Sequence, residues 1–173
     1  MHDDVYQMYL EEVKRIPACT RKEERLLLDQ IRNGNASARE RLLEGMLHFV
    51  LELSGRYKNR GLPMGDLVQE ANMALLLALE QYEKGEFRRQ VEDLAVSRIE
   101  EALEQQSQEK QAAEEVAARV NVLKDISQMM AEELGREATV EELAAKMKMT
   151  VEDIKDIMKV TLDAMSVSPE VRM

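Results

Sequence analysis

The sequence predicts an all-α protein, and three observations lead to this class. Leu, Ala, Glu, Lys and Met, all strong helix formers, dominate the 173 residues. Aromatic residues make up only 3% of the chain and Trp is absent, so few side chains favour strands. Signals that start and stop helices recur at short intervals. Because 45% of the residues are apolar, they can supply the core of one or two small domains.

The first half of the chain divides into four expected helices. Val5, Met8, Tyr9 and Val13 form one apolar face of a first helix, which ends before Pro17. The next helix begins with a capping-box pattern, a Thr followed three residues later by Glu, and the helices after it end near glycines. The expected spans are residues 3–13, 21–33, about 37–60 and 64–84. We expect these helices to pack as one bundle.

The stretch of residues 87–134 contains no proline or glycine, so we expect it to be helical. Its centre is rich in Glu, Gln and Ala, and the segment QQSQEKQ offers no large apolar side chain to bury. We therefore expect a break or domain boundary at this segment. The expected organisation is a bundle over residues 1–106, a linker or weak helix over 107–114 and a three-helix domain over 115–173.

The last third of the chain predicts a small helix-turn-helix-like unit. Thr139 with Glu142, and Thr150 with Asp153, cap two short helices that follow the helix ending at Gly135. Two interpretations stay open, architecture alone or contact with DNA, because any small three-helix bundle would carry the same caps. The lysines of this unit either meet phosphates or lie on a solvated face beside neighbouring acids. They are Lys146, Lys148, Lys155 and Lys159.

The net charge of −10 argues against a general nucleic-acid binder, which needs a basic surplus to neutralise phosphates. This argument holds only for the average over the chain. Residues 14–60 carry eleven Lys and Arg against six Asp and Glu, a local net of +5, whereas residues 61–119 carry six against thirteen, a net of −7. The chain is therefore polarised between a basic and an acidic segment.

No catalytic, metal or cofactor site is expected. The two histidines, His2 and His48, lie near a terminus and inside an apolar helix, and Cys19 has no second thiol for zinc or for a disulfide. The sequence has no glycine-rich phosphate loop, so we expect a chain that is not an enzyme and takes no small-molecule substrate. It shows no apolar span of membrane length and no secretory leader, which makes the cytoplasm the expected compartment.

The fourth expected helix carries polar groups at its start. Asp66, Gln69, Glu70 and Asn72 come immediately before the apolar run MALLLALEQY. A carboxylate is costly to bury alone, so these groups must face water, a local cap or another protein. Asp66 alone could cap the helix or complement its dipole, but capping does not account for the other three.

Two blocks of the chain resemble the sigma-70 family of bacterial RNA polymerase sigma factors. The first covers residues 3–83, in which RYKNRGLPMGDLVQEANMALLLALEQY is similar to the family's region two nearly position by position. The second covers residues 120–162, whose ELGRE motif and capped helix are similar to region three. The resemblance implies a transcription initiation protein, with a region-two-like bundle followed by a region-three-like domain.

The resemblance also implies a partner for the polar helix start. In sigma factors this helix docks on the basic clamp helices of the polymerase β′ subunit, and Asp66, Gln69, Glu70 and Asn72 occupy the contact positions. A carboxylate pair with adjacent amides offers charge-assisted acceptors to Arg and Lys, which suits such a partner. Core RNA polymerase is therefore the partner that the resemblance implies.

The segment that reads promoter DNA in this family departs from the family pattern. Leu94, Ser97 and Arg98 stand where sigma factors place a tyrosine and a pair of tryptophans that stack on melted DNA. None of the three offers an aromatic platform. Acids and a small residue occupy later positions that the family uses for DNA: Glu100, Glu101, Glu104, Glu115 and Ala118. The chain stops close to the end of region three, so no region-four domain is expected within it.

Three functions follow from these patterns. The first is a divergent sigma factor that binds core polymerase and directs it to promoters; the second is a sigma-like regulator that binds polymerase without melting DNA; the third is a helical adaptor. In the first function, RYKNR and other basic groups of residues 14–60 would take some of the phosphate contacts, and further basic residues of the chain are weaker candidates for DNA contact. These weaker candidates are Arg56, Lys58, Arg60, Arg88, Arg89, Arg98, Lys146 and Lys148.

Overall fold

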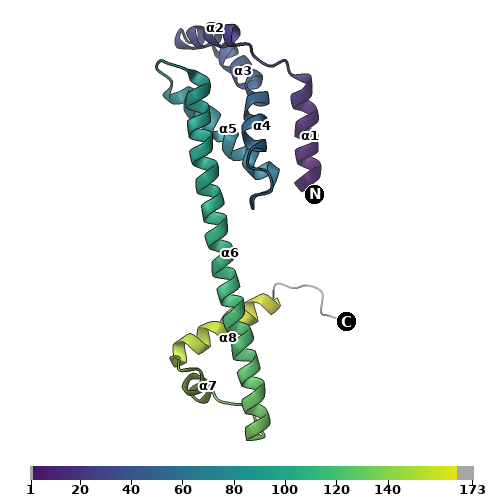
Figure 1. The fold of residues 1–173 in the computed structure, drawn as a ribbon, viewed down its shortest axis with the longest axis vertical. Coiled ribbons are helices and arrows are strands. Elements are labelled where there is room, and N and C mark those ends of the chain that lie inside the picture. Colours follow the sequence, from purple (N-terminus) through teal and green to yellow (C-terminus); the bar gives the residue numbers. More distant parts are fainter. Residues whose placement is uncertain (1, 167–173) are drawn as a thin grey trace. The chain divides into compact units, whose positions relative to one another are not determined.

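The computed structural model describes the backbone of residues 2–166 and the side chains of residues 3–162. Every regular element in this part of the chain is an α-helix (Figure 1), which confirms the all-α prediction for it. The helices are α1 (His2–Arg15), α2 (Arg21–Arg32), α3 (Ala36–Gly45), α4 (Leu47–Gly55), α5 (Met64–Gln81), α6 (Phe87–Leu134), α7 (Val140–Met147) and α8 (Val151–Ser166). Residues 167–173, the end of the expected last domain, lie outside the described part.

The chain divides into two compact units, Met1–Ser107 and Gln108–Met173, and α6 contributes to both. The first unit holds α1 to α5 and the first part of α6 around one apolar core. The second unit holds the remainder of α6 with α7 and α8 around a smaller core. None of the helices in the described part is long and apolar enough to span a membrane.

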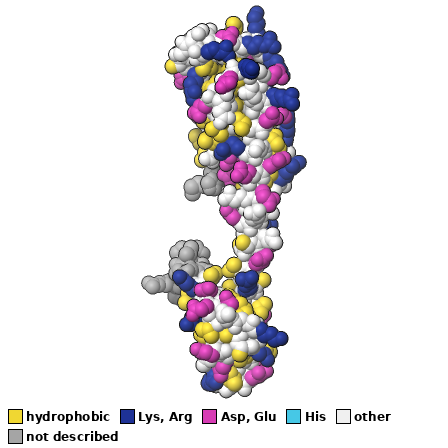
Figure 2. All heavy atoms as spheres, turned by 90° about the vertical axis from the view of Figure 1, so that its left-hand side faces the viewer, with side chains coloured by type: hydrophobic (Ala, Val, Ile, Leu, Met, Phe, Trp, Pro, Cys, Tyr) yellow, Lys and Arg dark blue, Asp and Glu magenta, His cyan; other side chains and the backbone are white. Residues whose placement is uncertain are grey.

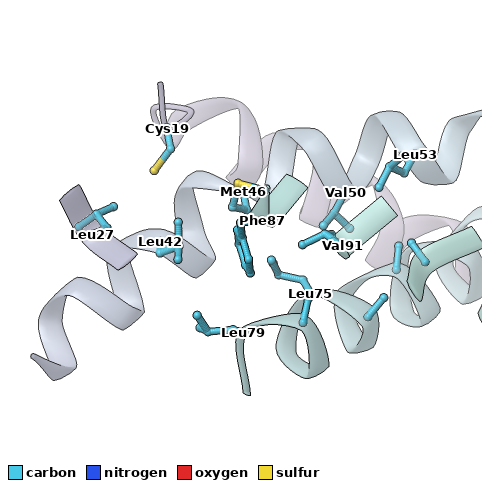
Figure 3. Packing of buried hydrophobic residues seen from close by; sticks show 14 of the residues in the cluster. Cys19, Leu27, Leu42, Met46, Val50, Leu53, Leu75, Leu79, Phe87 and Val91 are labelled. Atoms are coloured by element: carbon cyan, nitrogen blue, oxygen red, sulfur yellow. The ribbon is translucent and has the colours of Figure 1, made fainter. Parts of the chain in front are cut away.

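The core of the first unit is built on α5. Leu67, Ala71, Ala74, Leu75 and Ala78 recur at helical spacing and are almost completely buried. The alanines let neighbouring helices approach closely, while the leucines fill the space between them. In Figure 3, side chains from the α3–α4 segment meet those of α5 and of the start of α6; the labelled residues there include Met46, Val50, Leu75, Phe87 and Val91.

The expected third helix is two helices, α3 and α4, and this part of the prediction is wrong. The break lies at Met46, which follows Gly45. Gly45 packs directly against Cys19, because a β-carbon at this position would clash with the Cys19 sulfur. The Gly45 carbonyl also accepts a hydrogen bond from the Cys19 amide at 2.9 Å. Because this contact joins residues far apart in the chain, the local sequence around Gly45 does not reveal it.

The predicted helix caps are present. The Thr20 hydroxyl accepts a hydrogen bond from the Glu23 amide at the start of α2. Thr139 and Glu142 form a complete capping box at the start of α7. Thr150 and Asp153 make the equivalent reciprocal contacts before α8. Each contact satisfies backbone amides that have no partner inside the helix. This is why the Thr residues mark helix starts in the sequence.

The segment QQSQEKQ does not interrupt the helix, although the boundary between the two units falls between its Ser107 and Gln108. Side chains from Glu104 to Arg119 are all exposed, so this part of α6 lacks a packed apolar face. Its Glu, Gln, Lys and Ala residues favour helix strongly enough to continue α6 without such packing. The segment is therefore helical, and the division between the two compact units falls within it.

Candidate docking site at the start of α5

The first turn of α5 is held by its backbone and not by a side-chain cap. Its N-cap is Pro63, whose side chain makes no capping hydrogen bond, and the Asp66 amide donates to the Pro63 carbonyl at 3.1 Å. Asp66 lies within the first turn, where its carboxylate complements the helix dipole. Its exposed side chain makes no ion pair or hydrogen bond among the described residues. The carboxylate is therefore accessible to a partner.

A groove of about 610 Å³ runs between α1 and the start of α5. The exposed acids Asp3 and Asp66 are among its lining residues, on opposite sides, together with the exposed Gln69. Most of the remaining lining is apolar or aromatic. It consists of Val5, Tyr6, Tyr9, Pro63, Met64, Gly65, Val68, Asn72 and Met73. Two of the four predicted polymerase contacts, Asp66 and Gln69, thus stand free beside an apolar surface.

Asn72 lies in the same groove but already contacts α1. Its side-chain Nδ2 donates to the Tyr9 hydroxyl at 3.2 Å, while its Oδ1 is buried without a partner among the described residues. Burial is the main cause that raises the pKa of Tyr9, and the hydrogen bond from Asn72 opposes it. Tyr9 therefore stays protonated at neutral pH, and the Asn72–Tyr9 contact joins the two walls of the groove.

Glu70 faces a different neighbour. Its Oε2 lies 2.9 Å from Arg98 Nη2 of α6, and both side chains are about one-third exposed, 31% and 33%. Arg98 Nε is buried and has no partner among the described residues. One residue of helix corresponds to a rotation of about 100°, so Gln69 and Glu70 point to different sides of α5. The predicted polar row is therefore split between α1 and α6.

The chemistry of the site suits a basic protein surface. Exposed carboxylates and an amide lie beside apolar side chains, so an Arg or Lys could donate hydrogen bonds to these groups while its aliphatic stem packs on the apolar wall. The contribution of α1 to this site was not predicted. The apolar face expected for α1 was the available signal, because Val5 on that face is 67% exposed and lines the groove.

Three of the predicted DNA contacts are occupied by carboxylates of the same unit. Arg56 lies 2.6 Å from Glu92, and Arg98 pairs with Glu70. Arg88 makes two hydrogen bonds: its Nε donates to the buried Glu24 carboxylate at 2.7 Å, and its Nη2 donates to the Cys19 carbonyl at 3.1 Å. Its guanidinium also lies 5.3 Å from the ring centre of Phe49. The half-buried Arg88 therefore joins α2 and α6, and a DNA contact by it stays an untested prediction.

The other predicted DNA contacts lie on the surface. Lys58 and Arg60 are exposed in the turn after α4, where Arg60 stacks on Tyr57 at 5.1 Å, and Arg89 is exposed on α6. On the face drawn in Figure 2, Lys and Arg gather at the end of the first unit that carries α2, with more Asp and Glu toward its other end.

In the second unit, Lys146 and Lys148 are exposed around the turn between α7 and α8. Lys148 has φ of 55°, the left-handed conformation that ends α7. The structure therefore leaves both interpretations of these lysines open.

The positions that read promoter DNA in sigma factors form no aromatic surface. Leu94 packs partly buried against the core, Ser97 is exposed and Arg98 pairs with Glu70. Glu100 and Glu101 are exposed on the same helix. Glu104, Glu115 and Ala118 are exposed farther along. This part of α6 thus presents acids where contact with nucleic acid needs stacking or positive charge.

The histidine and the cysteine within the described side chains have structural contacts. His48 Nε2 lies 2.7 Å from the Ile16 carbonyl, and burial raises the pKa of the Cys19 thiol. No group of three or more potential metal ligands occurs among the described residues. A raised pKa lowers the fraction of reactive thiolate, so Cys19 is suited to packing.

Comparisons with known proteins point to one family. Residues 119–173 match the family described as Sigma-70 region 3. Over 167 residues, 95% of its length, the chain is 34% identical to the RNA polymerase sigma factor SigA of a Bacillus species and to that of Clostridium acetobutylicum. Over the same share it is 31% identical to RNA polymerase sigma factor RpoS of Coxiella burnetii. The chain spans 44% of each SigA and 47% of RpoS, less than half of these relatives.

Proposed function

We propose that the chain, as a member of the sigma-70 family of bacterial RNA polymerase sigma factors, binds core RNA polymerase and acts in transcription initiation. In this proposal it docks on the clamp helices of the β′ subunit and directs the polymerase to promoter DNA. Sigma factors are not enzymes, so membership of the family confirms the expectation that the chain is not one. Work at the polymerase would place the protein in the bacterial cytoplasm.

The observation that carries this proposal is the accessible polar edge of α5. Asp66 and Gln69 are exposed without partners among the described residues, and the buried face of the same helix anchors them in the core. A rigid helix holds the acceptors in place, so little conformational entropy is lost when a basic partner binds. Glu70 can join this edge if a partner cation replaces Arg98 as its neighbour.

The first test measures the affinity of the full chain for purified core RNA polymerase by fluorescence anisotropy. We expect Asp66→Lys to weaken binding at least tenfold, and Asp66→Lys with Glu70→Lys to abolish it, because each change opposes a basic partner with like charge. Glu80→Lys with Glu83→Lys is the matched control: it makes the same charge change at exposed acids near the other end of α5. Equal affinity of the wild type and the Asp66 and Glu70 variants would refute the proposal.

A second function is favoured by the promoter-reading positions of α6. Without an aromatic platform at Leu94, Ser97 and Arg98, the chain would occupy the polymerase without opening DNA by itself. Permanganate modification of unpaired thymines, in a complex of this chain with core polymerase and promoter DNA, distinguishes the two functions. Protected thymines with intact polymerase binding support the regulator, whereas reactive thymines show an initiation factor that melts DNA.

A further inference from the structure

We infer that the groove between α1 and α5 receives a basic amphipathic helix of the partner, so that α1 forms half of the docking surface. The inference rests on the proposed function, because the helix would belong to core RNA polymerase. It adds a second wall, formed by α1, and a set of contact residues that the polar row of α5 does not contain. The groove is built from α1 on one side and the start of α5 on the other.

The apolar lining of the groove favours a partner with an apolar face. Val5 is 67% exposed on the α1 side and Met73 is 42% exposed on the α5 side, and both line the groove with Tyr6 and Val68. Apolar side chains gathered in a concave site favour burial against another apolar surface. A groove of about 610 Å³ between two helices can take several side chains from one face of a third helix.

The charges around the groove select a basic partner. Asp3 of α1 and Asp66 of α5 contribute carboxylates from the two walls, and neither makes an ion pair among the described residues. Gln69 adds a further acceptor beside Asp66. A helix with Arg or Lys next to its apolar face would place cations at both acids while burying its apolar side chains. The same carboxylates would repel a nucleic-acid backbone or an acidic helix.

The test compares paired substitutions on α1 in the binding assay with core polymerase. Val5→Ser removes an apolar wall residue, and Met8→Ser removes an equally exposed apolar side chain of α1 that does not line the groove. Asp3→Lys reverses an acid of the groove, and Glu11→Lys reverses an exposed acid of α1 outside it. We expect the Val5 and Asp3 variants to bind about tenfold more weakly, and the two control variants to bind within about twofold of the wild type.

A photo-crosslinking amino acid at position 5 provides a second measurement. It is placed at an exposed side chain, so it reports the neighbour even if a substitution in the groove disturbs α1. We expect crosslinks to a basic helical segment of a polymerase subunit, located by mass spectrometry, and fewer crosslinks from the same group at position 8. Circular dichroism checks that every variant keeps its helix content.

The outcomes separate this inference from the proposed function. If Val5→Ser and Asp3→Lys bind like the wild type while Asp66→Lys does not, docking uses α5 alone and the inference is wrong. Crosslinks between two copies of the chain would instead make the groove a self-association surface and also overturn it. If the wild-type chain shows no affinity for core polymerase, the proposed function fails first.

Discussion

The charged side chains in the first turns of α5 and in the first half of α6 have opposite environments. On α5, the side chains of Asp66 and Gln69 stay exposed beside a groove and make no hydrogen bond or ion pair among the described residues. On α6, Arg88 and Arg98 are held by acids of neighbouring helices, and the groups left exposed at Glu100 and beyond are mostly acidic. The fold therefore leaves free a surface suited to a basic protein, and it pairs Arg88 and Arg98, two of the predicted DNA contacts, with its own acids.

The largest effect is expected at Arg88. If this arginine were a surface DNA contact and not a structural residue, the contrast between α5 and α6 would not hold. Arg88→Met leaves the buried Glu24 carboxylate without its cation, so we expect the free energy of unfolding to fall by about 2–4 kcal/mol. Arg89→Met is the matched control, since Arg89 is exposed and makes no such pair, and should change it by less than about 0.5 kcal/mol. Urea denaturation followed by circular dichroism measures both variants. Equal stabilities would show that Arg88 is not a structural residue.

A smaller effect is expected at Arg98, the contact that connects the two regions. Arg98→Ala removes the cation that occupies Glu70, so a basic partner no longer competes for this carboxylate. We expect affinity for core polymerase to rise about threefold to tenfold, with a stability loss of about 1 kcal/mol or less because the pair is partly exposed. Isothermal titration calorimetry measures the affinity. Weaker binding would mean that Arg98 itself contacts the partner, and the two regions would then form one surface.

The smallest effect is expected at Glu142, an acid whose carboxylate is held by hydrogen bonds within the second unit. Hydrogen bonds from Arg136, together with the Thr139 amide, lower the pKa of Glu142 from 4.5 to about 2. Because the folded-state pKa is depressed, this stabilisation is present above pH 4.5 and is lost as the pH falls toward 2. The melting temperature of the wild type, measured by thermal unfolding, should therefore fall more over this pH range than that of Glu142→Gln.

Glu141→Gln is the control for this measurement, because Glu141 is the exposed neighbouring acid and makes no capping contact. We expect the Glu141 variant to follow the wild-type pH dependence. A Glu142→Gln variant that also follows the wild-type curve would show that the capping box does not couple to pH. Asp66 differs from Glu142 because no cation of the described residues pairs with it.

Local sequence signals predicted much of the fold and part of the site. Thr20, Thr139 and Thr150 marked helix starts correctly, because capping involves residues only three positions apart. The sequence also located the polar start of α5. It did not predict that α3 and α4 are separate, because the close contact of Gly45 with Cys19 joins residues far apart in the chain.

The site was predicted incompletely for the same reason. The distribution of Asp66, Gln69 and Glu70 over two sides of α5 depends on which helices pack beside each side. The groove requires α1 next to α5, and the Asn72–Tyr9 hydrogen bond that joins them spans 63 residues. Neither the packing of helices beside α5 nor the Asn72–Tyr9 hydrogen bond can be inferred from spacing along one helix.

The sequence by itself determined the helical class, the capped helix starts and the acidic and amide character of the α5 edge. These features depend on propensity, periodicity and short-range hydrogen bonds, which a stretch of a few residues contains. Only the tertiary structure decided which of the charged groups remain available to a partner. That decision depends on long-range packing, which joins Arg88 to Glu24 and Arg98 to Glu70 but leaves Asp66 at an open groove.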